Sequence, residues 1–138
     1  MAAKITRGIK QMVAEANAEI ETISAQQAIK LKDDPNAVIV DLRDIRELTR
    51  DGRVPGALHA PRGMLEFWVD PESPYYKEIF GSGKKFVFFC AGGLRSALAA
   101  QTVQRMGLDP VCHIEGGFRA WKEAGGPVET PSADAAKK

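Results

Sequence analysis

The chain has 138 residues, 44% hydrophobic and 27% charged, which is the size and composition of one globular domain with a sizeable core. Its 19 Lys and Arg residues nearly balance 18 Asp and Glu residues, so the net charge of +1 gives no global field for nucleic acid or an acidic partner. Residues 1–10 lack the apolar segment of a signal peptide, and the longest apolar run, 86–91, is too short to cross a bilayer. We therefore expect a soluble, cytoplasmic protein.

The N-terminal segment, residues 1–20, is predicted to be a helical extension. Its apolar residues follow helical spacing over 5–20, at Ile5, Ile9, Met12, Val13, Ala16 and Ile20. We interpret this helix as packing on its own domain. The alternative is a helix that forms a dimer or docks a partner protein.

The rest of the chain alternates short apolar strands with helices. Ser24 is suited to cap a helix, and 37–42 is an apolar run without alternation, as in a strand buried on both faces. In chain order the predicted elements are strand 21–23, helix 25–32, strand 37–42, helix 44–50, strand 58–59, an irregular connection with helical pieces over 62–80, strand 85–89, a helix ending at Met106, strand 110–114 and a last helix ending near Gly125. This order is typical of an α/β sandwich with a mainly parallel sheet. The main domain is assigned to 21–129, and the small, polar segment 130–138 is predicted to be a disordered tail.

Cys90 follows the most apolar predicted strand, where a Gly-rich loop leads into a helix. Ligands of parallel sheets bind at the carboxyl ends of the strands, and Gly92 and Gly93 allow a turn that points several N–H groups inward. These donors and the positive end of the next helix favour a thiolate, which is the nucleophilic form. The alternative is a buried structural cysteine, and we adopt it for Cys112, inside a predicted strand. Neither G-K-[ST] nor G-x-G-x-x-G occurs, so a nucleotide site is not expected.

Four motifs in order resemble those of the rhodanese family. Residues 90–95 (CAGGLR) resemble its C-x-x-G-x-R active loop, and 40–43 (VDLR) resemble its D-x-R strand end. Residues 52–57 (GRVPGA) are similar to its G-H-I-P-G-A turn, with Arg53 in place of the usual histidine. Residues 115–128 carry its closing pattern, E-G-G-x-x-x-W followed by G-x-P-V.

The resemblance implies a three-layer sandwich in which a central, mainly parallel five-stranded sheet lies between helices. It also implies a sulfurtransferase, in which Cys90 takes a sulfane sulfur from a donor such as thiosulfate and holds it as a persulfide. A thiophilic acceptor, such as cyanide or a thiol, then removes the sulfur in a ping-pong reaction. The backbone N–H groups that would hold the sulfur anion belong to Ala91, Gly92, Gly93, Leu94 and Ser96.

Four other side chains complete the predicted site. Arg95 would close the loop and add positive potential, or else hold loop carbonyls in a purely structural role. By resemblance, Asp41 and Arg43 would brace the loop. The simpler interpretation, which we favour, is that Asp41 forms a structural ion pair with a nearby arginine. Alternatively, Arg43 and Arg62 would attract an anionic donor. The connection 62–80 either borders the mouth of the site and selects the acceptor, or covers apolar residues.

No metal and no organic cofactor is expected, so the persulfide on Cys90 is the only covalent group. The expected partners are a small anionic sulfur donor and a thiol or cyanide acceptor, with no nucleic acid and no membrane. Thiosulfate, 3-mercaptopyruvate, glutathione persulfide and a protein persulfide all remain open as donors.

Two other functions compete with sulfur transfer. Cysteine phosphatases on the same fold carry C-x5-R, whereas this loop reads C-x4-R, and Ser96 stands where the phosphatase arginine would. The shorter loop suits one sulfur atom better than a tetrahedral phosphate, so a phosphatase or arsenate reductase is the second choice. A persulfide carrier or regulatory binding module, docked through helix 5–20, is the third.

Overall fold

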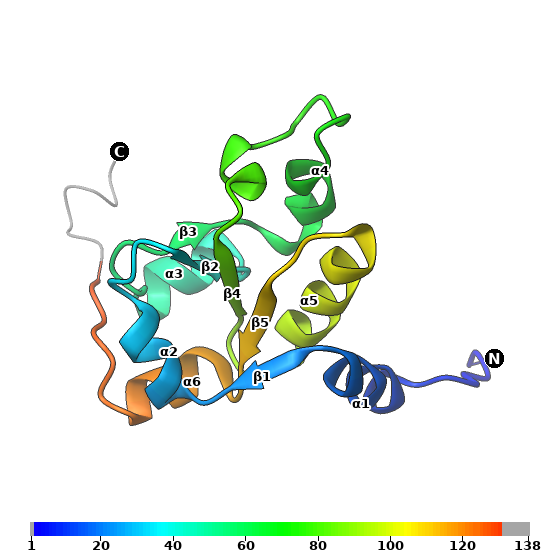
Figure 1. Cartoon of the computed structure of the whole chain (residues 1–138). Helices are drawn as coiled ribbons and strands as arrows, with labels where there is room; N and C mark the ends of the chain where they lie inside the picture. Colours follow the sequence, from blue (N-terminus) through cyan, green and yellow to red (C-terminus); the bar gives the residue numbers. More distant parts are fainter. Residues whose placement is uncertain (1, 131–138) are drawn as a thin grey trace.

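The computed structural model describes residues 2–130 and forms one five-stranded sheet in the order β1-β5-β4-β2-β3. All strand pairs of this sheet are parallel. The strands are β1 (Glu21–Ile23), β2 (Ala37–Asp41), β3 (Leu58–His59), β4 (Lys85–Phe89) and β5 (Val111–Ile114). β4 lies in the middle of the sheet (Figure 1), so the residue that follows it lies at the centre of the carboxyl edge.

Helices cover both faces of the sheet, which confirms the predicted three-layer architecture. The helices are α1 (Ile9–Glu19), α2 (Ala25–Leu31), α3 (Ile45–Asp51), α4 (Leu65–Val69), α5 (Leu94–Met106) and α6 (Gly117–Glu123), with short 3-10 turns at Arg62–Met64 and Glu78–Gly81. In Figure 1, α1, α4 and α5 lie on one side of the sheet, and α2, α3 and α6 lie on the other. Among residues 2–130, no helix is long and apolar enough to span a bilayer.

β4 is buried on both faces of the sheet, which explains why its sequence is apolar without alternation. Phe86 and Phe88 pack into the core beneath α1 and α5, while Val87 and Phe89 pack into the core beneath α2 and α6. All four side chains are at most 1% exposed. A strand buried on both faces needs apolar residues at every position, and the predicted bounds of this strand are confirmed.

α1 packs on its own domain through its second half. It begins at Ile9 and not at residue 5, and both Ile5 and Ile9 are largely exposed. Ala16 is fully buried, and the C-terminal Glu19 pairs with Arg105 of α5. The helix is therefore shorter than predicted because its first apolar residues find no core to enter.

Local signals set several element ends. Ser24 forms a capping box with Gln27 at the start of α2, as its position in the sequence predicts. Gly107 ends α5 in a left-handed conformation, with φ of 112°. Of the predicted tail, residues 131–138 lie outside the described part of the chain.

Candidate active site

Cys90 lies at the carboxyl end of β4, and its side chain is turned into the loop that begins α5. Its Sγ accepts hydrogen bonds from the backbone N–H groups of Gly93 (3.1 Å) and Ser96 (3.4 Å). Cys90 is 1% exposed, so the sulfur is held inside the loop. Two backbone donors and the positive end of α5 together provide electrostatic stabilisation for a sulfur anion.

The predicted ring of loop donors is only partly formed around the sulfur. Within the described loop, Gly93 and Ser96 donate to Sγ, whereas Ala91, Gly92 and Leu94 make no backbone hydrogen bond to it. Gly93 has a φ of 105°, and a Cβ there would lie 3.4 Å from the backbone nitrogen of Gly116. Glycine is therefore favoured at position 93 by its left-handed backbone conformation, since a Cβ at this distance would make only an ordinary contact.

The start of α6 holds the outer side of the loop. The N–H of Phe118 donates to the carbonyl of Cys90 (2.8 Å), and the N–H of Arg119 donates to that of Ala91 (3.2 Å). The backbone comes so close that a Cβ on Gly117 would lie 2.3 Å from the Cys90 carbonyl oxygen. This role of the 115–128 motif, which turns the loop carbonyls away from the sulfur, was not predicted from the sequence.

Arg95 is held at the rim of the site by Glu47 of α3. Its guanidinium donates to both carboxylate oxygens, at 2.8 and 3.1 Å, and its side chain is 41% exposed. The hydrogen bonds from Arg95 lower the pKa of Glu47, so this carboxylate stays charged at neutral pH. The side-chain hydrogen bonds of Arg95 go to Glu47 and not to loop carbonyls, and the carbonyls of Cys90 and Ala91 are bound by N–H groups of α6. Glu47 is a residue of the site that the sequence analysis missed.

Asp41 and Arg43 form the predicted ion pair, which lies beneath the loop. Arg43 binds Asp41 through Nη2 (2.8 Å) and Nε (3.0 Å), and its Nη2 also donates to the carbonyl of Gly52 (2.9 Å). The Arg43 guanidinium lies 4.1 Å from the ring centre of Phe118. Both charged residues are 1% exposed, so Arg43 is too deeply buried to attract a donor from solvent.

Arg62 and Arg53 each pair with a carboxylate. Arg62 follows β3 at the same edge of the sheet, and its Nη1 donates to Glu66 (2.6 Å) with 30% of its side chain exposed. Arg53, in the place of the family's histidine, pairs with Glu129 (2.9 Å). Of Arg43 and Arg62, the two arginines predicted as alternatives to attract an anion, only Arg62 is exposed to solvent.

The consecutive β5 residues Cys112 and His113 point to opposite faces of the sheet. Cys112 packs in the core beneath α2 and α6, as predicted, and burial raises the pKa of its thiol to about 12. The adjacent His113 points to the opposite face, where its Nδ1 lies 2.9 Å from Ser96 Oγ. His113 was not among the predicted site residues, although the alternation of a strand places it opposite Cys112.

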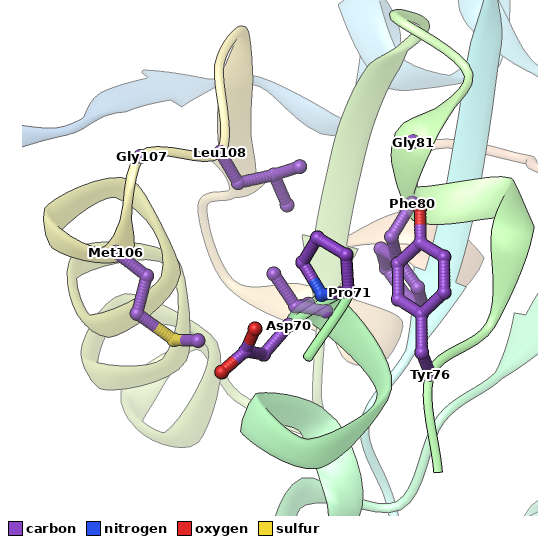
Figure 2. Close-up of a pocket in the computed structure, with 9 residues that line it drawn as sticks. Asp70, Pro71, Tyr76, Phe80, Gly81, Met106, Gly107 and Leu108 are labelled. Atoms are coloured by element: carbon purple, nitrogen blue, oxygen red, sulfur yellow. The ribbon is translucent and has the colours of Figure 1, made fainter. Parts of the chain in front are cut away.

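A surface hollow of about 420 Å³ lies elsewhere, at the far end of α5. Figure 2 shows it between Asp70, Pro71 and Tyr76 of the 62–80 connection and Met106 and Leu108. Since α5 has 13 residues, its two ends are about 20 Å apart. Part of the 62–80 connection therefore borders this hollow and not the Cys90 sulfur. Within residues 2–130, no cluster of three or more potential metal ligands occurs.

The sequence model of the rhodanese-like domain matches residues 24–124. The chain belongs to the rhodanese-like family. The parallel five-stranded sheet of this rhodanese-like chain agrees with the fold that the motifs implied. Cys90 lies in the loop after β4, where the motif places it.

Two solved structures are similar over nearly the whole chain. One, from Rhodopseudomonas palustris CGA009, is described as a protein of unknown function and possible tyrosine phosphatase; it is 62% identical, has a TM-score of 0.90, and the match covers 94% of this chain and 99% of that one. The other is a polysulfide-sulfur transferase homodimer from Wolinella succinogenes, 31% identical with a TM-score of 0.67, covering 90% of this chain and 88% of that one.

Curated relatives are longer proteins. The tRNA uridine(34) hydroxylase of Cronobacter sakazakii (strain ATCC BAA-894) is 30% identical over 128 residues, which is 90% of this chain and 36% of that protein. That of Enterobacter sp. (strain 638) is 29% identical over the same shares. The rhodanese-like chain therefore spans about a third of the length of these relatives.

Proposed function

We propose that this rhodanese-like chain is a sulfurtransferase that carries sulfur as a persulfide on Cys90. The observation that supports this most is the position of Sγ, which faces the N–H groups of Gly93 and Ser96 inside a C-x4-R loop. A terminal persulfide sulfur is a small anion of a size that such a loop can bind. The likeness to a polysulfide-sulfur transferase supports the same chemistry.

In the first half-reaction the Cys90 thiolate attacks the outer sulfur of a donor such as thiosulfate. The S–S bond of the donor breaks, sulfite leaves with the electron pair, and Cys90–S–S⁻ remains. In the second half-reaction cyanide or a thiolate attacks the terminal sulfur, and thiocyanate or a new persulfide leaves while Cys90 returns to the thiolate. Each step exchanges one S–S bond for another bond to sulfur, so no metal, organic cofactor or oxidant is needed.

The rim of the site suits an anionic donor. Arg95 and Arg62 lie at the carboxyl edge of the sheet with 41% and 30% of their side chains exposed. Each is paired with a carboxylate, Glu47 or Glu66, so an anionic donor would bind their guanidinium N–H groups and not an excess of positive charge. A small anion such as thiosulfate is therefore the proposed donor class, and the acceptor is a thiol or cyanide. The hydroxylase activity named for the longer relatives is not part of this proposal.

A phosphatase is the second candidate, because the 62% identical protein is described as a possible tyrosine phosphatase. A phosphate dianion needs a ring of N–H donors and an arginine that reaches across it. Here the loop has one residue fewer than C-x5-R, Ser96 takes the arginine's position, and Arg95 is bound to Glu47. These features favour a single sulfur over a phosphate.

Two reactions measured on the same purified protein distinguish the sulfurtransferase from the phosphatase. We expect thiocyanate to form from thiosulfate and cyanide in proportion to the protein, while para-nitrophenyl phosphate is hydrolysed no faster than by a Cys90→Ala sample. The opposite pattern, with Cys90-dependent ester hydrolysis and no thiocyanate from any sulfane donor, would establish the phosphatase instead.

A further inference from the structure

Four side chains form a hydrogen-bonded chain that starts at Cys90 and ends on α1. The Sγ of Cys90 lies 3.7 Å from Ser96 Oγ, and Ser96 Oγ lies 2.9 Å from His113 Nδ1. The other ring nitrogen, Nε2, lies 2.8 Å from Asn17 Oδ1. Ser96 is fully buried and His113 is 2% exposed, so the part of the chain from Cys90 to His113 is shielded from water, whereas Asn17 at its end is exposed.

The hydrogen bonds of this chain all run in one direction. Asn17 Oδ1 is a carbonyl oxygen and only accepts, so His113 Nε2 must carry the proton. The Thr22 hydroxyl lies 3.5 Å from the same oxygen and donates to it. In a neutral imidazole Nδ1 is then the acceptor, and it receives the Ser96 O–H. The lone pairs of Ser96 Oγ are left to accept the S–H of Cys90.

We propose that His113, acting through Ser96, is the internal base that deprotonates Cys90, and that Asn17 positions it. Before Cys90 attacks the donor, its S–H proton moves to Ser96 Oγ while the Ser96 hydroxyl proton moves to His113 Nδ1, which supplies the thiolate of the first half-reaction. The products are a thiolate, an unchanged serine and an imidazolium, and no proton is exchanged with solvent. The inference rests on the proposed role of Cys90 as the nucleophile.

Burial determines when the imidazolium exists. It lowers the pKa of His113, so the imidazole is neutral while Cys90 is a thiol. A sulfur anion two hydrogen bonds away offsets this cost, because opposite charges attract strongly in a medium of low polarity. The persulfide is also an anion, so His113 keeps the proton until the acceptor has taken the sulfur. The Cys90 thiolate then recovers its proton along the same path.

Several charged groups around this hydrogen-bonded chain are paired with each other, and Arg95 also interacts with Cys90 itself. On the elements that pack against Cys90 and His113, these pairs are Arg95–Glu47, Arg43–Asp41, Arg105–Glu19, Lys85–Glu21 and Arg119–Glu123. Cys112 lies on the opposite face of β5, and His59 binds the carbonyl of Arg43. None of these groups makes a hydrogen bond to Ser96 or His113 in the described structure, which leaves His113 as the base in contact with the nucleophile's partner.

The proposed proton relay, from Cys90 through Ser96 to His113, gives the N-terminal helix α1 a part in the site. Asn17 belongs to α1, which lies before the segment matched by the family's sequence model, 24–124. α1 is anchored to α5 by the carbonyl and carboxylate of Glu19, two residues beyond Asn17, so the amide is fixed relative to His113. Residues 1–20 thus contribute a positioning residue and are more than a cover for the sheet.

The test uses two substitutions of Asn17 with opposite expected effects, made in a Cys112→Ala background so that Cys90 is the only cysteine. Thiolate formation is followed by its ultraviolet absorbance as the pH is raised, and circular dichroism confirms folding. Asn17→Asp places a carboxylate against Nε2–H and favours the imidazolium, so the midpoint should fall by about 1 pH unit. Asn17→Leu removes the acceptor that sets the tautomer, and Ser96→Ala cuts the path, so both should raise the midpoint.

A negative charge that acted directly on the sulfur would raise the midpoint of the thiolate titration. A midpoint that falls in Asn17→Asp, but not in the double variant Asn17→Asp/Ser96→Ala, therefore supports the relay. An unchanged or raised midpoint in folded Asn17→Asp overturns it. The titration needs no sulfur donor, so its outcome is separate from that of the sulfurtransferase proposal. Persulfide formation with no relay signature would leave the proposed function standing and remove only this inference.

Discussion

Replacing Cys90 by alanine is expected to abolish thiosulfate-to-cyanide sulfur transfer, while replacing Cys112 leaves most of it. Cys90 Sγ faces the backbone donors of Gly93 and Ser96, and no other described thiol can reach them. Cys112 lies in the core on the other side of β5, where burial raises the pKa of its thiol to about 12. A protonated, buried thiol is a poor nucleophile. Initial rates of thiocyanate formation at matched protein concentrations measure the difference.

Cys112→Ala is a matched control because both substitutions remove one buried sulfur. It creates a small cavity and is expected to lower stability slightly without touching the loop. Equal losses of transfer in the two variants, with both proteins folded, would contradict a mechanism with one sulfur-carrying cysteine.

Arg43→Met is expected to lower the free energy of unfolding by about 3–5 kcal/mol. The substitution keeps most of the side-chain volume but leaves the Asp41 carboxylate buried without its partner, and it removes the hydrogen bond to the Gly52 carbonyl. It also removes the cation that lies 4.1 Å from the Phe118 ring centre, at the start of the helix that holds the loop carbonyls. Since domains of this kind have stabilities of about 5–15 kcal/mol, much of the stability would be lost. Urea denaturation measures the change.

Two further variants test whether the loss in Arg43→Met comes from the unpaired Asp41 charge or from the loss of an arginine as such. Arg46→Met removes an arginine that pairs with Asp44 on the surface and should change stability little, because exposed ion pairs contribute little. Asp41→Asn combined with Arg43→Met should recover part of the loss, because no unpaired buried charge remains. A loss below about 1 kcal/mol in Arg43→Met alone would show that Asp41 finds other solvation and that the pair does not brace the loop.

Short-range signals account for the parts of the fold that the sequence predicted well. The bounds of β4 followed from an apolar run between Lys84 and Cys90, and α2 began where Ser24 caps it. Both depend on residues within one or two turns of each other. α1 was predicted four residues too long at its start because helical spacing continues through Ile5, and spacing alone does not show where the neighbouring core ends.

The partners of the active loop depend on residues far apart in the chain. Glu47 and Arg95 are 48 positions apart, and Asn17 and His113 are 96 positions apart. Parallel strands and their crossovers bring these residues to one edge, and no local pattern marks them. The motif at 90–95 therefore located the nucleophile, whereas the chains of contacts that hold Arg95 and Ser96 became visible only in the folded arrangement.

Intact mass after incubation with thiosulfate tests the central claim most directly. We expect the wild-type protein to gain one sulfur atom and then to lose it when cyanide is added, and Cys90→Ala to gain none. That result would establish a persulfide on Cys90 and its transfer to an acceptor. No gain in the wild type with thiosulfate, polysulfide or glutathione persulfide would contradict the sulfurtransferase assignment and favour the phosphatase.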